Sequence, residues 1–266
     1  MNKPLLSICI PTYNQAKGIE RFLLSIESQI APDVEIVVQD DSTNDETRKL
    51  VERFSSTMPI RYFGRHCYFK QHGENIEKLK RGERGGIDRS IIFLTEEARG
   101  TYVWWMGDDA LRPGALTRVA SLLQSSPDIT FIWVNHQVAD SGKLALDLGD
   151  DHFFNNRNEI LEQVVSGLGF ISATIFKKEK ALAGIEGSKR YIGTAFVNLY
   201  IALHVLSQEG TYYYLRGPYL TSYLNAPDET NDNGFEVFGV HFYRIIQAFQ
   251  NKFGARSIRK ALAKHF

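Results

Sequence analysis

The sequence predicts an α/β domain in which a mainly parallel β-sheet is flanked by helices. Residues 5–10 are a short run of apolar, mostly branched side chains closed by Pro11, which is typical of a buried strand. In residues 19–26 apolar side chains recur at helical spacing, and residues 34–38 form a second apolar run. A strand, a helix and another strand at this spacing predict βαβ units, whose strands pair in parallel.

The alternation continues after the second strand, with one interruption. Thr43 and Glu46 are spaced as a capping box that opens a helix reaching Phe54. Residues 64–86 then hold five glycines among six Lys and Arg residues, and they predict a long, mobile, basic connection. The expected later elements are a helix at 88–99, a strand at 102–106, a helix opened by Pro113 and a strand at 129–134.

The second half of the chain has a less regular pattern. It predicts helices near 160–165 and 196–206, strands at 170–176 and 212–215, and a closing helix with an apolar stripe over 238–253. Because no repeat or clear linker divides the sequence, we expect a single domain over residues 1–266.

Composition excludes several classes of function. Lys+Arg and Asp+Glu both number 31, so no net positive field favours nucleic acid, and we expect no nucleic-acid partner. Cys9 and Cys67 are the two cysteines, too few for a disulfide framework. The first apolar run is too short for a signal peptide, and no run approaches the ~18 apolar residues of a membrane span. We therefore expect a soluble, cytoplasmic protein.

Three polar clusters follow predicted strands. They are residues 11–14, the pair Asp40 and Asp41, and residues 107–109. Ligands of open parallel sheets bind at the carboxyl ends of strands, so these clusters are candidate site residues. Taken alone, the first cluster is better explained by a plain strand-to-helix turn, and helix capping explains part of the second.

The sequence Gly107-Asp108-Asp109 is harder to explain structurally. Two adjacent carboxylates after an apolar strand repel one another, and a divalent cation such as Mg²⁺ or Mn²⁺ would relieve this repulsion. Such a metal could hold a diphosphate and neutralise a departing nucleotide. We favour metal ligation over capping here. The second Gly-Asp-Asp, at 149–151, follows no strand and is interpreted as a solvated loop.

Three segments together resemble glycosyltransferase family 2, which has the GT-A fold. Residues 7–14 (Ser-Ile-Cys-Ile-Pro-Thr-Tyr-Asn) resemble its opening strand, residues 35–47 its second-strand motif, and residues 98–116 its metal-site segment. Their order and spacing match over about the first half of the chain. The Trp-rich form with Gly-Asp-Asp and a following Pro-Gly is most similar to the abequosyltransferase and rhamnosyltransferase branch, which builds bacterial surface polysaccharides such as O-antigen or capsule.

The resemblance implies a transfer of sugar from a nucleotide-diphosphate donor to a saccharide acceptor, which we expect to be lipid-linked. It implies a donor half at 1–125, an acceptor half at 126–250 and a basic C-terminal helix at 251–266. Asp40 would hydrogen-bond the base, Asp108 would bind Mn²⁺ or Mg²⁺, and Asp109 would act beside the donor sugar in catalysis. The implied nucleotide-sugar-binding residues are Pro11, Thr12, Tyr13, Asn14, Asp40, Asp41, Asp88, Arg89, Gly107 and Asp108.

Two positions depart from the family pattern. The family's metal motif usually has a carboxylate two residues before Asp108, where this chain has Met106. Inverting members also place an acidic general base at the start of a helix in the second half, where this chain has Ala195 and Phe196. The general base is therefore unassigned, and the acidic residues near that region are Glu186, Asp228, Glu229 and Asp232.

Alternatives remain open. A nucleotidyltransferase would share the sheet and the metal, but residues 11–14 are not the Gly-rich phosphate loop it should carry. A non-catalytic sugar- or nucleotide-binding protein would explain the absent base. His136 and His204 are interpreted as core histidines. Residues 252–266 hold five basic side chains and no acidic one, which predicts either a peripheral contact with the inner membrane face or an ordinary helix packed on the core.

Overall fold

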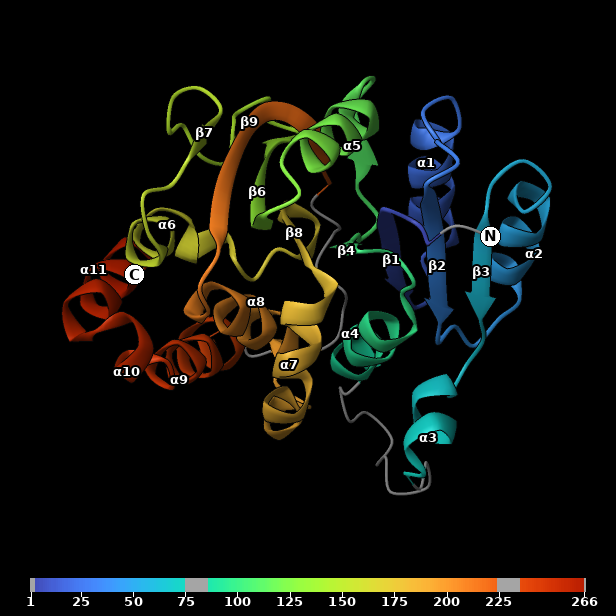
Figure 1. Ribbon diagram of the computed structural model, residues 1–266. Coiled ribbons are helices and arrows are strands. Elements are labelled where there is room, and N and C mark those ends of the chain that lie inside the picture. Colours follow the sequence, from blue (N-terminus) through green and yellow to red (C-terminus); the bar gives the residue numbers. More distant parts are fainter. Residues whose placement is uncertain (1–2, 75–85, 224–234, 266) are drawn as a thin grey trace.

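The computed structural model describes residues 3–74, 86–223 and 235–265 (Figure 1). Residues 75–85 of the predicted basic connection, and Asp228, Glu229 and Asp232, lie outside the described residues. The described part of that connection contains a short helix at 67–72, which the prediction of a plain loop missed. The first half of the chain alternates strands and helices as predicted, and it adds three short elements at 60–63, 67–72 and 110–111 that were not predicted. Its elements are β1 (Leu6–Thr12), α1 (Ala16–Ile26), β2 (Val34–Asp40), α2 (Glu46–Phe54), β3 (Ile60–Phe63), α3 (Cys67–His72), α4 (Gly86–Glu97), β4 (Tyr102–Trp105), β5 (Ala110–Leu111), α5 (Ala115–Ser125) and β6 (Ile129–Val138).

The second half contributes more helix than strand. Its main elements are β7 (His152–Phe153), α6 (Arg157–Val164), β8 (Thr174–Lys177), α7 (Lys178–Ser188), α8 (Val197–Ser207), β9 (Thr211–Ser222), a π-helical turn (Phe235–His241), α9 (Phe242–Gln247), α10 (Gln250–Phe253) and α11 (Ala255–His265). The predicted closing helix is interrupted. Helix α9 ends before Phe249, and the backbone turns again at Gly254, whose φ is 80°.

The sheet has strand order β3-β2-β1-β4-β8-β6-β9-β5 among the described residues, with β7 paired to β9. Strands β3, β2, β1 and β4 are parallel, which confirms the predicted βαβ arrangement. Strand β8 is antiparallel to both β4 and β6, so it joins the parallel part to the second half. Because β1, β2 and β4 run the same way, their carboxyl ends lie at one edge.

Two hydrophobic cores cover the two faces of this sheet. Alternate residues point to opposite faces of a strand, so Ile8 and Trp104 pack with α1, α2 and α5, whereas Cys9 and Trp105 pack with α4, α7 and α8. Trp104 and Trp105 are fully buried, as the apolar strand predicts. The result is a sheet between two helical layers.

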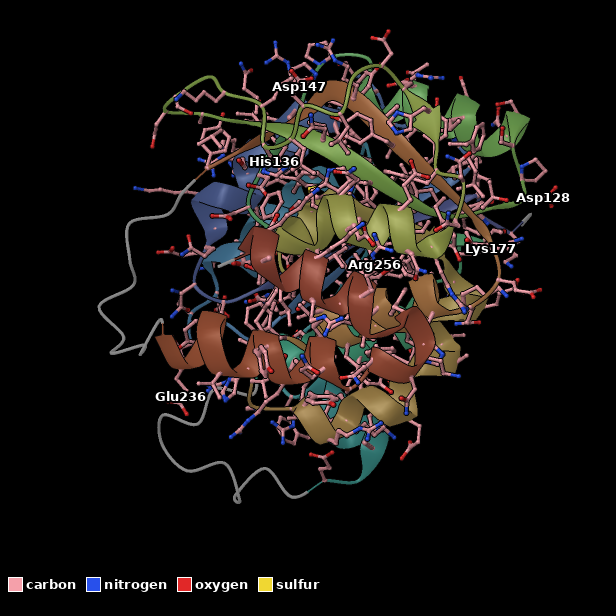
Figure 2. The ribbon with its side chains drawn as sticks, turned by 90° about the vertical axis from the view of Figure 1, so that its left-hand side faces the viewer. Asp128, His136, Asp147, Lys177, Glu236 and Arg256 are labelled. Carbon is pink, nitrogen blue, oxygen red and sulfur yellow. The ribbon has the colours of Figure 1, made fainter. Side chains whose placement is uncertain are left out.

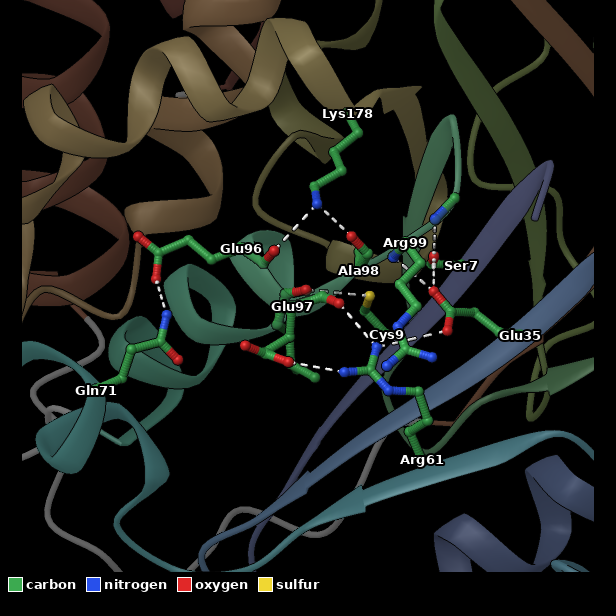
Figure 3. Close-up of polar contacts among 12 residues, drawn as sticks. Ser7, Cys9, Glu35, Arg61, Gln71, Glu96, Glu97, Ala98, Arg99 and Lys178 are labelled. Atoms are coloured by element: carbon green, nitrogen blue, oxygen red, sulfur yellow. Dashed lines mark hydrogen bonds and ion pairs between the residues drawn. The ribbon is translucent and has the colours of Figure 1, made fainter. Parts of the chain in front are cut away.

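A buried polar network anchors the amino-terminal edge of the sheet (Figure 3). Glu35, 6% exposed, accepts hydrogen bonds from the Ser7 hydroxyl and the Arg99 amide, both 2.6 Å long. Arg61 lies 3.5 Å from Glu35 and donates a 2.7 Å bond to Glu97. These contacts fix α4 against the sheet, with its N-terminus toward the opposite edge.

Two local predictions were wrong. Thr43 does not cap α2, because its amide and hydroxyl both donate to Asn14 Oδ1, while the Glu46 amide donates to Asn44 Oδ1. Asp151 is not a solvated loop residue, because it accepts a 2.7 Å bond from Arg118 and a 2.8 Å bond from the Arg216 amide.

The C-terminal helix packs on the protein. Ile258 and Ala261 are at most 1% exposed, and Lys260 forms a 3.0 Å ion pair with Glu162 of α6. Figure 2 views the side on which α11 lies beside α6, with Arg256 labelled. This arrangement matches the core-packed alternative for the basic segment. Within the described ranges, every helix is too short or too polar to cross a bilayer.

Candidate active site

The loops that follow β1 and β2 are bonded into one surface. Thr12 and Asp40 are neighbours in the strand register, and the Asp41 amide donates to the Thr12 carbonyl at 3.0 Å. The Asn14 amide donates to the Ser42 hydroxyl at 2.8 Å. Asn14 has a φ of 52°, a left-handed conformation that Asn tolerates better than most residues. The predicted residues of these two loops are thus adjacent.

The side chains of the first loop differ in exposure. Pro11 lies within β1 and is paired with Gln39 of β2. Thr12 is 7% exposed, and its hydroxyl has no partner among the described residues. Tyr13 is 55% exposed. An unpaired buried hydroxyl beside an exposed aromatic ring is suited to a ligand with a polar group and a flat face.

Asp40 is held by the protein itself. It is 3% exposed, and its carboxylate accepts from the Ser42 amide at 2.9 Å and from the Tyr62 hydroxyl at 2.8 Å. Burial and the bond to Asp40 raise the pKa of Tyr62, which therefore stays protonated. The Asp40 carboxylate is rigidly placed, and its expected contact with a nucleobase stays a prediction.

Asp41 joins three elements. Its carboxylate accepts a 2.8 Å bond from Gln39 on β2 and a 3.4 Å bond from the His66 amide before α3, and it lies 3.5 Å from the Ser90 hydroxyl on α4. Burial lowers the pKa of His66, with nearby Arg65 adding to the effect. These contacts position the start of α4 near the carboxyl edge of the sheet.

Asp88 has contacts that the sequence did not predict. It is 1% exposed, and its two oxygens accept from the amides of Gly193, Ala195 and Val197 at 2.8–3.0 Å. Burial raises its pKa, against the effect of these bonds. Asp88 therefore fixes the turn that opens α8, where the resembled family places its base. Its expected donor contact stays a prediction.

Arg89 faces the neighbouring helix. Its guanidinium lies 3.3 Å from Glu74 and 5.0 Å from the ring centroid of Phe69 on α3. The structure thus separates Arg89 from Asp88, although the two are adjacent in sequence, and a donor contact of Arg89 also stays a prediction.

The Gly107-Asp108-Asp109 turn places its two carboxylates differently. Asp109, 2% exposed, accepts a 2.5 Å bond from the Ser172 hydroxyl and a 3.1 Å bond from the Tyr223 amide. The Gly107 amide donates to the same Ser172 hydroxyl at 2.9 Å. Burial raises the pKa of Asp109 to about 6, and the charge of Asp108 adds to this rise. Asp109 is thus an inward anchor with an easily protonated carboxyl.

Asp108 lies beside Arg21, which was not among the predicted site residues. The Arg21 guanidinium donates a 2.5 Å bond to the Asp108 carbonyl and lies 3.9 Å from its carboxylate. The same guanidinium carbon is 3.7 Å from the ring centroid of Tyr223. Gly18 allows this approach, because a Cβ there would lie 2.2 Å from the Asp108 Cβ. Helix α1 therefore supplies a fixed positive charge beside the turn.

The Asp108 carboxylate suits a metal that is bound together with a phosphate ligand. Met106 is fully buried in the core, and the described residues contain no group of three His, Cys, Asp or Glu side chains that could hold a metal. The Asp108 carboxylate keeps 18% exposure. Mg²⁺ and Mn²⁺ sites with one or two carboxylates complete their coordination with substrate phosphates and water. Asp108 can serve such a site.

The region expected to hold a general base is apolar. Ala195 has a left-handed φ of 63°, and Phe196 is 3% exposed. Glu186 is 86% exposed on α7 and pairs with Lys189 at 2.8 Å, and the other three acidic residues lie outside the described ranges. The structure assigns no base among these residues.

The chain is similar to a known protein family over most of its length. A family model described as Glycosyl transferase family 2 matches residues 7–179, which include both polar loops and the Gly107–Asp109 turn. The abequosyltransferase RfbV of Salmonella typhimurium is 29% identical over 224 residues, 77% of this chain and 62% of the relative. The GalNAc(5)-diNAcBac-PP-undecaprenol beta-1,3-glucosyltransferase of Campylobacter jejuni is 25% identical over 74% of this chain and 60% of the relative.

A solved structure supports the fold. The Staphylococcus aureus TarS structure of residues 1–349 matches with a TM-score of 0.71 at 14% identity, covering 98% of this chain and 72% of TarS. At this identity the likeness concerns the fold, and it confirms the GT-A expectation. The chain spans about 60% of the length of the two curated relatives named above.

Proposed function

The chain belongs to glycosyl transferase family 2, in the branch that includes abequosyltransferases, and we propose that it transfers a sugar from a nucleotide-diphosphate donor to a saccharide acceptor. The proposed setting is the synthesis of a bacterial surface polysaccharide. The observation that carries the proposal is the carboxyl edge of β1, β2 and β4, where the Thr12–Asp40 loops and the Asp108 turn lie at the ends of neighbouring parallel strands.

Each part of this edge has a proposed role. Pro11, Thr12, Tyr13 and Asn14 line the nucleoside, with the unpaired Thr12 hydroxyl as a bonding group and Tyr13 as a stacking face. Asp40 reads the base, and Asp41 holds the segments around Asp40. Gly107 holds the Asp108 turn through its bond to Ser172. A divalent cation held by Asp108 would neutralise the leaving diphosphate. Asp109 fixes the turn beside the donor sugar.

The chain divides into a part that binds the donor and a part that binds the acceptor. We propose that residues 1–125 bind the donor, that residues 126–250 bind the acceptor and that α11 (Ala255–His265) is a structural helix with a basic face. The Campylobacter relative, whose name specifies a PP-undecaprenol acceptor, supports a lipid-linked acceptor for this chain. A lipid-linked acceptor would place the protein in the cytoplasm at the inner membrane face.

Donor hydrolysis tests the function. The purified chain is incubated with a panel of nucleotide sugars, with Mn²⁺ or with EDTA, and nucleotide release is measured. We expect release from one donor class and loss of release in Asp108→Asn. Asp140→Asn, an exposed change in a turn, is the matched control. In a parallel incubation with nucleoside triphosphates and sugar 1-phosphates, release of pyrophosphate would instead identify a nucleotidyltransferase. Binding without release from any donor would identify a non-catalytic binder, which the apolar Ala195–Phe196 turn favours as the second candidate.

A further inference from the structure

A cavity lies away from the donor edge, between α8, the turn that follows α7 and the α9–α10 turn. Its volume is about 380 Å³, and its walls include Arg190, Tyr200, His204, Gln208, Phe249 and Lys252. Two of these side chains are always cationic, and His204 becomes so when protonated. The described residues of its lining include no carboxylate.

Two glycines of α7 shape this cavity. A Cβ at Gly187 would lie 2.2 Å from the Tyr200 hydroxyl, and a Cβ at Gly184 would lie 2.9 Å from the His204 ring. Without side chains at these positions, α7 approaches α8 closely enough to hold both rings. His204, predicted as a core residue, instead forms part of a wall.

Arg190 is held in place, and Arg190 and Lys252 are both exposed at the rim of the cavity. Arg190 donates a 2.9 Å bond to the Gly187 carbonyl and lies 3.3 Å from the Tyr200 hydroxyl, which raises its pKa. Burial lowers the pKa of His204, and Lys252 adds to this effect. Within the described ranges, neither Arg190 nor Lys252 forms an ion pair with a carboxylate.

Two buried aromatic side chains form the closed floor beneath these charges, Tyr200 at 7% and Phe249 at 5% exposure. Tyr200 stacks near His204 with ring centroids 6.3 Å apart at 22°, and Phe249 lies 5.1 Å from Tyr200. Arg and Lys bind phosphate oxygens. Two cations over a closed aromatic floor match a phosphate group.

We propose that this cavity binds the phosphate group of the saccharide acceptor. The assignment rests on the proposed function, because it takes α8 as part of the acceptor half. The turn that Asp88 fixes lies at the start of α8, and seven residues, about 10 Å of helix, separate Val197 from His204. One helix therefore connects the turn where the family places its acceptor-activating group to the phosphate site.

Binding of two probes tests the proposal. Calorimetry with inorganic pyrophosphate and with a water-soluble short-chain prenyl diphosphate saccharide is performed in EDTA, which removes any metal from the donor edge. The double variant Arg190→Gln with Lys252→Gln should weaken binding about tenfold or more, as expected for the loss of charge-assisted bonds. Lys189→Gln removes the same charge one residue from Arg190 but outside the cavity lining, so it should bind like the parent.

The outcomes separate the possibilities. Tighter cavity-dependent binding of the saccharide probe than of pyrophosphate supports the acceptor assignment. Equal affinity for the two probes overturns that assignment and leaves a free-phosphate site. Unchanged binding in the double variant, or an equal loss in Lys189→Gln, overturns the site. Because the readout is binding in EDTA, failure to observe sugar transfer would leave this result intact.

Discussion

The Ser172 hydroxyl donates a 2.5 Å hydrogen bond to Asp109, and through the same oxygen it accepts the Gly107 amide. One side chain from the turn before β8 thus holds both ends of the Gly107–Asp109 turn. Asp109 is buried by this arrangement, and burial raises its pKa to about 6 from its usual value near 3.8. The protonation of Asp109 is therefore linked to folding.

The first prediction concerns stability against pH in the metal-free protein. Because the folded state holds the Asp109 proton to a higher pH than the unfolded state, this residue contributes stability at low pH that is lost as pH rises from about 4 to about 6. The difference of about two pKa units corresponds to at most ~3 kcal/mol. We expect Asp109→Asn to flatten this part of the curve, measured by urea unfolding in EDTA. An unchanged slope between pH 4 and 6 would contradict the assignment.

The second prediction concerns Arg21. Its bond to the Asp108 carbonyl and its position over Tyr223 join α1, the Asp108 turn and the end of β9. Arg21→Met should lower the free energy of unfolding by about 1–3 kcal/mol and weaken nucleotide-diphosphate binding. Arg53→Met, at an exposed ion pair with Glu20, should change stability by less than about 1 kcal/mol. Equal effects in chemical unfolding would show that Arg21 is an ordinary surface residue.

The third prediction concerns base recognition by Asp40. Asp40→Ala removes a carboxylate fixed by Ser42 and Tyr62, and we expect a loss of about 1–3 kcal/mol in binding the preferred nucleotide. Tyr62→Phe keeps the carboxylate and removes one partner, so it separates positioning from direct contact. If Asp40→Ala weakens the binding of all nucleotide diphosphates and of pyrophosphate equally, Asp40 does not read the base.

The fourth prediction concerns the C-terminal helix. Because Phe253, Ile258 and Ala261 are buried, truncation after Gln250 should destabilise the fold rather than simply remove a membrane contact. The exposed pair Arg256 and Arg259 offers a cleaner test. If the basic face binds anionic lipid, Arg256→Gln with Arg259→Gln should reduce co-sedimentation with anionic vesicles, at about 1 kcal/mol per charge. Equal sedimentation of variant and parent would make the helix purely structural.

Local sequence patterns were sufficient to predict three of the four strands in the parallel part of the sheet. Strands β1, β2 and β4 are buried apolar runs, and their ends bring the polar clusters to one edge as predicted. Strand β3 was missed because its four residues are only half-buried and carry no clear alternation. The strand predicted at 170–176 starts at Thr174, because residues 171–173 form the turn that presents Ser172.

The partners within the site could not be predicted from local pattern. Arg21 looked like the polar face of an amphipathic helix, and its contact with Asp108 spans 87 positions in the sequence. The bond from Ser172 to Asp109 spans 63 positions and depends on β8 pairing antiparallel to β4. Such contacts follow from strand order, which hydrophobic periodicity does not encode.

The account depends most directly on Asp108. Its carboxylate is partly exposed at the carboxyl edge of the sheet, beside the fixed charge of Arg21, where a metal with a diphosphate would bind. The deciding measurement is calorimetry of nucleoside diphosphate binding to the parent chain and to Asp108→Asn, with Mn²⁺ and with EDTA, after circular dichroism has shown that both are folded. We predict Mn²⁺-dependent binding in the parent and its loss in the variant. Equal, metal-independent affinity in the two proteins would contradict the account.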